Sequence, residues 1–325
     1  MSDERFLVTG AFGCIGTWIV RELVRDGVAV TALDLGAEPA RWPLAMSDDE
    51  IARVRRRQGD ITDLEQMERV VDDDAITHVI HLAALQVPFC RADPPLGARV
   101  NVLGTVNVFE AVKRRADRIA SVVYASSIAA YDALEEGGGT VEMSGQPGTL
   151  YGVYKRANEG TAHVYWADHG VGSVGLRPHT VFGPGRDQGL TSAPTTAMLA
   201  AAAGRAYRIP FGGTSQYQYA PDAARAFLAA ARAPAHGASV HNLAGMSVSM
   251  AELVAAITAA APDSAGRIEF DDVLLPFPGT VDAASFAALF GAIPETPFPE
   301  AVADSVARFR DLIARGLVDP TRYLP

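Results

Sequence analysis

The sequence predicts an α/β fold with a doubly wound parallel sheet and a second, smaller α/β domain toward the C-terminus. Short apolar segments rich in β-branched residues alternate with segments of helical spacing from residue 5 to residue 177. A glycine-rich turn joins the first apolar segment to the first helical one. After Pro178 the composition shifts toward glycine, proline and alanine, and the elements become shorter. We therefore expect one domain over 1–178 and a second mainly over 179–325, with about 220–246 returning to the first.

The first strand, glycine turn and helix are expected within RFLVTGAFGCIG, residues 5–16, and the helical pattern that follows. Gly10 permits the tight turn, Gly13 lets the backbone approach a pyrophosphate, and Gly16 lets the helix pack close to the sheet. The phosphates would face the free N–H groups and the positive end of the helix dipole. This succession is typical of a Rossmann-type dinucleotide site.

The second strand, residues 28–34, ends in a carboxylate that bears on the choice of dinucleotide. Asp34 lies eighteen residues after Gly16, which is about where a carboxylate meets the adenosine ribose. It can accept hydrogen bonds from both ribose hydroxyls, and its charge repels a 2′-phosphate. The pattern therefore favours NAD over NADP.

The alternation continues through the rest of the chain. The third strand is expected as a solvated edge rich in arginine over 53–58, and the next helix begins at a capping box, Thr62 to Glu65. The fourth strand, 77–82, ends in Ala83-Ala84, which are small enough to admit a dinucleotide. We expect further helices over 96–115, 151–168, 195–203, 221–231, 249–260 (again with a capping box) and 298–314, further strands over 121–125 and 171–177, and a surface loop over 135–148.

Tyr151 and Lys155 carry the expected chemistry. They lie four residues apart and hence on one face of a helix. An ammonium beside the phenol, together with the positive nicotinamide, favours the phenolate and brings the phenol pKa from about 10 toward working pH. The phenolate can then take a proton from a carbinol while hydride leaves. Ser127, at the mouth of the fifth strand, can hold the same hydroxyl in line.

The order of these motifs resembles that of the extended short-chain dehydrogenase/reductases, also called the NAD-dependent epimerase/dehydratase family. The resemblance covers nearly the whole chain and includes TGAFGCIG (9–16), GDITD (59–63), HLAA (81–84), NVLGTVNVFEA (101–111), SSIAAY (126–131), YGVYK (151–155) and LRPHTVFGPG (176–185). It implies Tyr151 as general acid/base, Lys155 as its activator and Ser127 as the residue that positions the substrate. The cofactor implied is NAD, with 1–178 as its domain and 179–325 mainly as the substrate-binding domain. The cofactor contacts implied are Gly10, Phe12, Gly13, Cys14, Ile15, Gly16, Asp34, Asp60, Ile61, Leu82, Ala83, Ala84, Asn101, Ala125, Tyr151, Lys155 and Pro178.

Departures from the family pattern bear on the substrate. Members that act on nucleotide-diphosphate sugars usually carry an arginine in each of two segments, which are 212–221 and 275–286 here, and neither segment contains one. The charge-assisted hydrogen bonds that hold a diphosphate would therefore be missing. Ile128 and Ala129 follow Ser127 where a dehydratase has an acidic pair, which argues against elimination.

Arg186 is the nearest remaining cation at the expected mouth of the site. Its planar fork suits a carboxylate or paired hydroxyls, whereas an ion pair with Asp187 or another acid is the competing interpretation. Gln216 would add neutral hydrogen bonds suited to a polyol. Thr180 stands where many sugar epimerases have asparagine and does not decide the reaction. The substrate contacts expected are Gln86, Ser127, Thr180, Arg186 and Gln216.

Three functions remain open. The favoured one is an NAD-dependent dehydrogenase that oxidises a secondary alcohol or lactol of a free sugar or sugar acid and releases NADH. The alternative is a nucleotide-sugar 4-epimerase that keeps NAD tightly bound. A non-enzymatic NAD-binding sensor is the weaker alternative, because the Ser-Tyr-Lys set is intact.

The composition limits the partners and the setting. A formal net charge of −10 argues against nucleic acid or an anionic membrane as partner, and no apolar run is long enough to span a bilayer. The charged N-terminus runs straight into the first strand, so no secretory signal is expected. The two cysteines, Cys14 and Cys90, are too few for a disulfide framework, which suits a reducing, cytoplasmic setting. No metal site is expected, and the resemblance implies a homodimer paired through the helices over 96–115 and 151–168.

Overall fold

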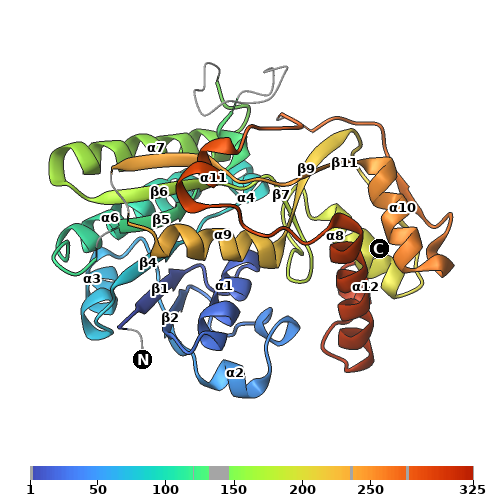
Figure 1. Cartoon of the computed structure of the whole chain (residues 1–325), viewed down its shortest axis with the longest axis horizontal. Coiled ribbons are helices and arrows are strands. Elements are labelled where there is room, and N and C mark those ends of the chain that lie inside the picture. The colour runs from blue at the N-terminus through green and yellow to red at the C-terminus, as the bar shows by residue number, and fades with distance from the viewer. Residues whose placement is uncertain (1–2, 120, 132–145, 235–236, 276–277, 325) are drawn as a thin grey trace.

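A seven-stranded parallel sheet forms the centre of the molecule (Figure 1). Its strands have the order β10-β6-β5-β4-β1-β2-β3. The structure, a computed structural model, describes residues 3–119, 121–131, 146–234, 237–275 and 278–324, so most of the loop expected over 135–148 lies outside the described residues. Every neighbouring pair of strands in the sheet runs parallel, which confirms the predicted fold class. The strands are β1 (Arg5–Thr9), β2 (Ala29–Asp34), β3 (Arg55–Gln58), β4 (His78–His81), β5 (Ser121–Ala125), β6 (Gly172–Arg177) and β10 (Ala238–Asn242).

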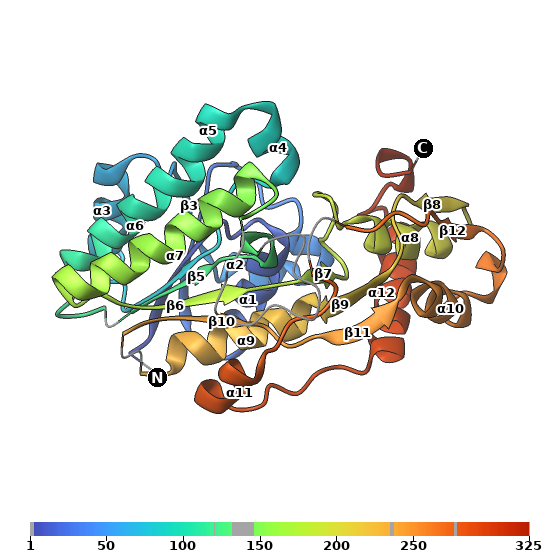
Figure 2. The same cartoon turned by 90° about the horizontal axis from the view of Figure 1, so that it is seen from above.

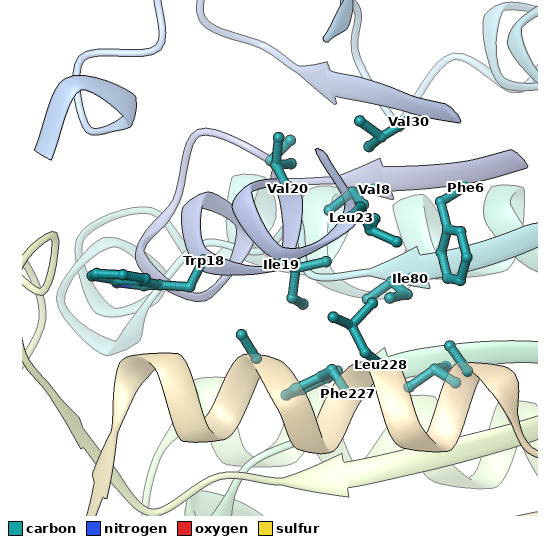
Figure 3. Packing of buried hydrophobic residues seen from close by; sticks show 14 of the residues in the cluster. Phe6, Val8, Trp18, Ile19, Val20, Leu23, Val30, Ile80, Phe227 and Leu228 are labelled. Atoms are coloured by element: carbon teal, nitrogen blue, oxygen red, sulfur yellow. The ribbon is translucent and has the colours of Figure 1, made fainter. Parts of the chain in front are cut away.

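Helices cover both faces of this sheet (Figure 2). On one face α1 (Cys14–Arg25) packs against α9 (Ala220–Arg232), and on the other α6 (Gly104–Lys113) lies between α3 (Leu64–Asp73) and α7 (Leu150–His169). The side chains of β1 alternate between the two cores, because successive residues of a strand point to opposite faces. Phe6 and Val8 therefore join the core on the side of α1 and α9, which Figure 3 shows from close by, and Leu7 joins the other.

The remaining elements build a second core beside the carboxyl edge of the large sheet (Figure 2). Its three-stranded sheet has the order β11-β9-β7, and its two-stranded sheet pairs β12 with β8. These strands are β7 (Thr180–Phe182), β8 (Tyr207–Ile209), β9 (Thr214–Tyr219), β11 (Met246–Ser249) and β12 (Ile268–Phe270), and the helices are α8 (Ala193–Ala202), α10 (Met250–Ala260) and α12 (Phe298–Ala314). The helix α11 (Ala284–Phe290) instead packs on β10, and its Phe286 joins the core on the side of α1 and α9.

Two elements between these strands lie with the large sheet rather than with the second core. β10 pairs in parallel with β6, and α9 packs on α1, β4 and β5. The chain therefore crosses the edge of the large sheet more than once, and the segment after β6 passes directly over the carboxyl ends of the strands. The shorter helical segments are α2 (Asp48–Ala52), α4 (Val87–Ala92), α5 (Pro94–Ala98), and the single turns Trp42–Leu44, Arg99–Leu103, Ile128–Ala130, Pro262–Ser264 and Pro320–Arg322.

The long helix predicted over 96–115 is interrupted. A π-helical turn, Arg99–Leu103, separates α5 from α6. Asn101 lies in this turn, and its side chain accepts from the Leu85 N–H at 2.7 Å and donates to the Leu85 carbonyl at 2.9 Å. The π turn thus occurs where the Asn101 side chain bonds the backbone of Leu85. A local sequence pattern does not reveal such a contact between separate segments.

The two predicted capping boxes have different outcomes. Ser249 and Glu252 form one at the start of α10, as expected. The box expected at Thr62 is wrong, because α3 begins one residue later, with Asp63 accepting from the Gln66 N–H. The Thr62 N–H instead donates to the Asp60 carboxylate at 2.8 Å. Two competing acceptors in GDITD explain the shift of one residue.

The arginine-rich third strand is the predicted edge of the sheet. Two of its side chains do more than face solvent, since Arg55 and Arg57 both pair with Asp74, whose side chain is buried. Within the described residues, no helix is long and apolar enough to cross a membrane.

Candidate active site

A cleft of about 530 Å³ opens at the carboxyl ends of the central strands, and residues of the segment that follows β6 line one side of it. Its volume lies in the range of small-molecule sites, about 300–1,000 Å³. The glycine turn after β1 lines it, as do the residues after β2, β3, β4 and β5, the first turn of α7, and residues 178, 179, 181 and 185–191. Ligands of open parallel sheets bind at this edge.

The glycine turn is shaped by close backbone approaches. Gly10 has a φ of +68°, and a Cβ there would lie 2.6 Å from the Ala83 backbone nitrogen. A Cβ at Gly16 would lie 2.5 Å from the Gly10 carbonyl oxygen, so both positions require glycine. Gly13 caps α1 without a side-chain hydrogen bond, which leaves the first N–H groups of the helix for a ligand. These features fit a pyrophosphate.

Asp34 ends β2 beside this turn. Its carboxylate accepts from the Phe12 N–H at 2.9 Å and from the Gly36 N–H at 3.3 Å. The side chain is only partly buried, so lone pairs remain toward the cleft. A carboxylate at the end of the second strand is the group that holds an adenosine ribose, and the donor set therefore fits a dinucleotide.

Most of the predicted site residues meet in the cleft. Those that line it are Gly10, Phe12, Gly13, Cys14, Ile15, Gly16, Asp34, Asp60, Ile61, Leu82, Ala83, Ala84, Gln86, Ala125, Ser127, Tyr151, Lys155, Pro178 and Arg186. Asn101, Thr180 and Gln216 are not among the lining residues. Thr180 is fully buried in β7 beside His179, and Gln216 bonds the backbone of Val281. Asn101 is 1% exposed and holds Leu85, so it supports the segment that carries Gln86.

Ser127, Tyr151 and Lys155 come together from two elements. Ser127 caps the turn after β5, where its hydroxyl accepts from the Ala129 N–H at 3.1 Å and also shares a hydrogen bond with Tyr151. The Lys155 ammonium donates to the Ala125 carbonyl at 2.7 Å and lies 5.5 Å from the centre of the Tyr151 ring. A Cβ at Gly152 would lie 2.0 Å from the Ala129 carbonyl oxygen, so this glycine lets α7 approach the Ser127 turn.

The surroundings shift both titrating groups. Burial raises the pKa of the Tyr151 phenol, while the Ser127 hydrogen bond and the charge of Arg186 act in the opposite direction. Burial lowers the pKa of Lys155 to about 8, against the influence of Glu159. Shifts of this kind beside a cleft are typical of acid/base chemistry.

A buried ion pair underlies this group and was not predicted. Arg177 at the end of β6 donates to both carboxylate oxygens of Glu159 at 2.7 Å, and their side chains are 2% and 9% exposed. The Ser126 hydroxyl also donates to Glu159, and Arg177 donates to the Tyr131 hydroxyl at 2.9 Å. The pair therefore joins β5, β6 and α7 directly behind the cleft. Glu159 stands one helical turn after Lys155, and this spacing was the available signal.

Arg186 lies beside the reacting group without an acidic partner among the described residues. Its Nη2 donates to the Thr191 hydroxyl at 3.0 Å, but its buried Nε has no hydrogen-bond partner in the described part of the chain. The buried Oε1 of Gln86 is unpartnered in the same sense, and both side chains lie close to Gly189. Asp187, the expected competitor for Arg186, pairs instead with Arg41. Arg41 is a cleft residue that sequence reasoning missed.

No cluster of three or more His, Cys, Asp or Glu side chains that could hold a metal ion occurs in the described ranges. Cys14 lies in the cleft, where burial raises the pKa of its thiol to about 11. Its thiolate is therefore scarce near neutral pH, which makes it a poor nucleophile.

Comparison with known proteins gives concordant results. The profile of the NAD dependent epimerase/dehydratase family matches residues 6–244. A UDP-glucose 4-epimerase of Mycolicibacterium smegmatis is 32% identical over 271 residues, which cover 80% of this chain and 84% of that protein. UDP-glucuronate 4-epimerase 2 of Arabidopsis thaliana is 34% identical over 183 residues, or 55% of this chain. The match spans 42% of the plant protein, less than half of its length.

Two solved structures share the whole fold. UDP-glucose 4-epimerase of Thermus thermophilus, in complex with NAD, is 26% identical with a TM-score of 0.78, covering 94% of this chain and 99% of that one. The holo form of a GalE-like L-threonine dehydrogenase of Cupriavidus necator is 25% identical with a TM-score of 0.82, covering 93% and 99%.

Proposed function

The chain belongs to the NAD dependent epimerase/dehydratase family, and from this premise we propose that it is a dehydrogenase of free sugar acids. Its cofactor is NAD, which accepts hydride when bound. The reaction would oxidise a secondary alcohol or a lactol. One observation supports the choice of substrate above others: the guanidinium of Arg186 lines the cleft near Tyr151 and is paired with no acid of the described chain.

Each cleft residue has a separate task in this proposal. Tyr151 takes the proton of the substrate hydroxyl, and Ser127 bonds the same hydroxyl and sets its direction. Lys155 favours the Tyr151 phenolate through its positive charge, and its bond to the Ala125 carbonyl fixes its position. Arg186 binds the substrate carboxylate by a bidentate contact, with Gln86 beside it for a neighbouring hydroxyl. Holding the carboxylate fixes the alcohol against Tyr151, which lowers the entropic part of the barrier.

The diphosphate of a nucleotide sugar has weaker support. The lining residues of the cleft within the described chain all fall between residues 10 and 191. Gln216 lies in the segment that lacks the expected diphosphate arginine, and it bonds the Val281 backbone rather than the cleft. Among the described residues, therefore, no cation beyond residue 191 lines the cleft.

A nucleotide-sugar 4-epimerase that retains NAD is the second candidate. The relative from M. smegmatis, which matches most of this chain, is named a UDP-glucose 4-epimerase, and the plant relative is named a UDP-glucuronate 4-epimerase. A uronate substrate would also offer a carboxylate to Arg186. The two candidates differ in whether the diphosphate contributes to binding.

Calorimetry on the complex with NADH separates the candidates, because NADH prevents oxidation of the probe. We expect D-glucuronate or D-galacturonate to bind more tightly than D-glucose, UDP or UDP-glucose. Arg186→Ala should weaken sugar-acid binding by about tenfold or more and leave NADH affinity little changed, because a hydrogen-bonded charge is lost. Arg53→Ala, on the exposed surface, is the matched control. Tight binding of UDP-glucuronate without binding of the free acids would replace the dehydrogenase with the epimerase.

A further inference from the structure

The only acid beside Arg186 in the sequence is Asp187, and the structure holds it away. The Arg41 guanidinium donates to Asp187 from Nε at 3.0 Å and from Nη2 at 2.7 Å. Both side chains are mostly buried, being 21% and 23% exposed. Arg41 and Asp187 are 146 residues apart in the chain, so this pair joins the segment after β2 to the loop after β7.

Arg41 is held in place by the glycine turn. Its Nη1 donates to the Phe12 carbonyl at 3.0 Å, and the next residue, Trp42, donates from its indole to the Ala11 carbonyl at 3.0 Å. Trp42 is fully buried and packs edge-on against Phe12, with ring centres 5.1 Å apart. These contacts fix the backbone at Arg41 and Trp42 and hold the Arg41 guanidinium between the Phe12 carbonyl and Asp187.

The loop that carries Asp187 rests on the same turn. Gly185 has a φ of +95°, and a Cβ there would lie 3.8 Å from both Arg41 Cδ and Cys14 Cα. Pro184 accepts a hydrogen bond from the Trp18 indole at 3.0 Å. Residues 184 to 187 thus pack against the glycine turn and the start of α1. The Arg186 side chain lies in the cleft, where its charge reaches Tyr151.

We propose that Arg41 is a positioning residue that withdraws Asp187 from Arg186 and so keeps the Arg186 guanidinium free for an anionic substrate. The inference rests on the proposed function, because it assumes that Arg186 binds a substrate carboxylate. The charge of the ligand that the cleft prefers would then depend on Arg41 through its pairing with Asp187.

The electrostatics around Cys14 agree with this arrangement. The charges of Arg186, Arg41 and Asp187 all reach its thiol: the two arginines lower its pKa and Asp187 raises it, beside the larger effect of burial. The three groups therefore share one neighbourhood with two positive charges and one negative charge. Without Arg41, the Asp187 carboxylate would be largely buried with no partner, and Arg186 would be its nearest cation. An ion pair between Asp187 and Arg186 would then neutralise the positive charge that the substrate carboxylate needs.

A set of four proteins tests the inference: the wild type, Arg41→Gln, Asp187→Asn and the double variant. The measured quantity is the dissociation constant of D-glucuronate and D-galacturonate for the NADH complex, with NADH saturating and its own affinity recorded. We expect Arg41→Gln to weaken sugar-acid binding by about tenfold, since Asp187 then neutralises Arg186. Asp187→Asn should bind nearly as well as the wild type, and the double variant should recover most of the loss.

Recovery in the double variant is the decisive result. If the Arg41–Asp187 pair acted only by holding the loop in place, removing Asp187 as well as Arg41 would not restore binding. Binding by the double variant that is as weak as that of Arg41→Gln, or weaker, would overturn the inference. Arg41→Lys, which keeps the positive charge, should lie closer to the wild type than Arg41→Gln. Arg186→Ala tests the proposed function separately: if it leaves sugar-acid binding unchanged, the proposed function fails whatever the rescue shows.

Discussion

Tyr151 is the residue on which the proposed chemistry depends. It meets Ser127 and Lys155 in the cleft, and its hydroxyl is the only proton-transfer group assigned there. Tyr151→Phe removes that hydroxyl and keeps the ring. We expect turnover to fall by about 10²- to 10⁴-fold, the usual contribution of general acid/base catalysis, with little change in NAD affinity. Steady-state rates and NAD titration of the same preparations measure both, and near-normal turnover would refute the assignment.

The pH dependence of oxidation reports on the same residue. In the proposed mechanism oxidation needs the Tyr151 phenolate, so we expect the rate to rise with pH through the pKa of the phenol. Burial raises this pKa, and Arg186 opposes the rise because a positive charge favours the phenolate. Arg186→Gln should therefore move the midpoint of the kcat profile to higher pH, measured at saturating substrate. Arg53→Gln, an exposed surface variant, should leave the midpoint unchanged; an unmoved or lowered midpoint in Arg186→Gln would count against the placement of this charge.

At the scale of elements, the contact between α7 and the turn after β5 sets the distance between Tyr151 and Ser127. Gly152 permits this contact, since a Cβ would lie 2.0 Å from a backbone oxygen that cannot yield by rotating a side chain. Gly152→Ala should lower the free energy of unfolding by about 1–3 kcal/mol and reduce turnover more than NAD affinity. Denaturant unfolding and steady-state rates give the two quantities.

Gly160→Ala is the matched control on the same helix. A Cβ at Gly160 meets nothing within 4 Å, so alanine should be neutral or stabilising by up to about 1 kcal/mol through its higher helix propensity. Gly160 is exposed on α7, where pairing with a second chain is predicted. The molecular mass of each variant in solution is therefore measured first, and the two variants are compared in the same oligomeric state. Equal behaviour of the two variants would show that the close approach at Gly152 is unimportant.

Elements with a strong local pattern could be predicted from the sequence, and features that depend on distant contacts could not. Six strands of the central sheet, the glycine turn and α7 were predicted from the spacing of apolar residues and the positions of the glycines. The seventh strand, β10, was expected only as part of a segment, about 220–246, that returns to the first domain. The π turn at Asn101 depends on a bond to Leu85, sixteen residues away, and the Arg41 pair spans 146 residues. Thr180 was expected at the substrate because of its place in the motif order, and Gln216 because its amide suits a polyol. In the structure Thr180 is fully buried in β7, and the Gln216 side chain bonds the Val281 backbone.

At the scale of the whole molecule, α7 presents an exposed stripe that suits a second copy of the chain. Val153 and Val164 are 44% and 51% exposed, and Ala157 and Gly160 lie between them on the same face. Leu103, 45% exposed, adds to the apolar surface at the neighbouring π turn. We predict a homodimer paired through α6 and α7, because small and apolar side chains allow two helices to pack closely.

Light scattering at micromolar protein concentration measures the mass that this prediction concerns. The wild type should have twice the mass of the chain, and Val164→Glu should shift the mass to that of one chain by placing a charge in the interface. Leu274→Glu is the control, because Leu274 is 75% exposed and its side chain lies beside Gly213, next to β9, rather than on α6 or α7. A monomeric wild type would contradict the predicted pairing.

The accumulation of NADH tests the central claim most directly. The protein is mixed with NAD and, in separate samples, with D-glucuronate, D-galacturonate, D-glucose, L-threonine, UDP-glucose or UDP-glucuronate, and the absorbance of NADH is followed. A dehydrogenase of free sugar acids should produce NADH in proportion to the acid consumed, with D-glucose and the UDP-sugars giving little. Conversion of a UDP-sugar to its 4-epimer without net NADH, together with no reaction of the free acids, would contradict the account.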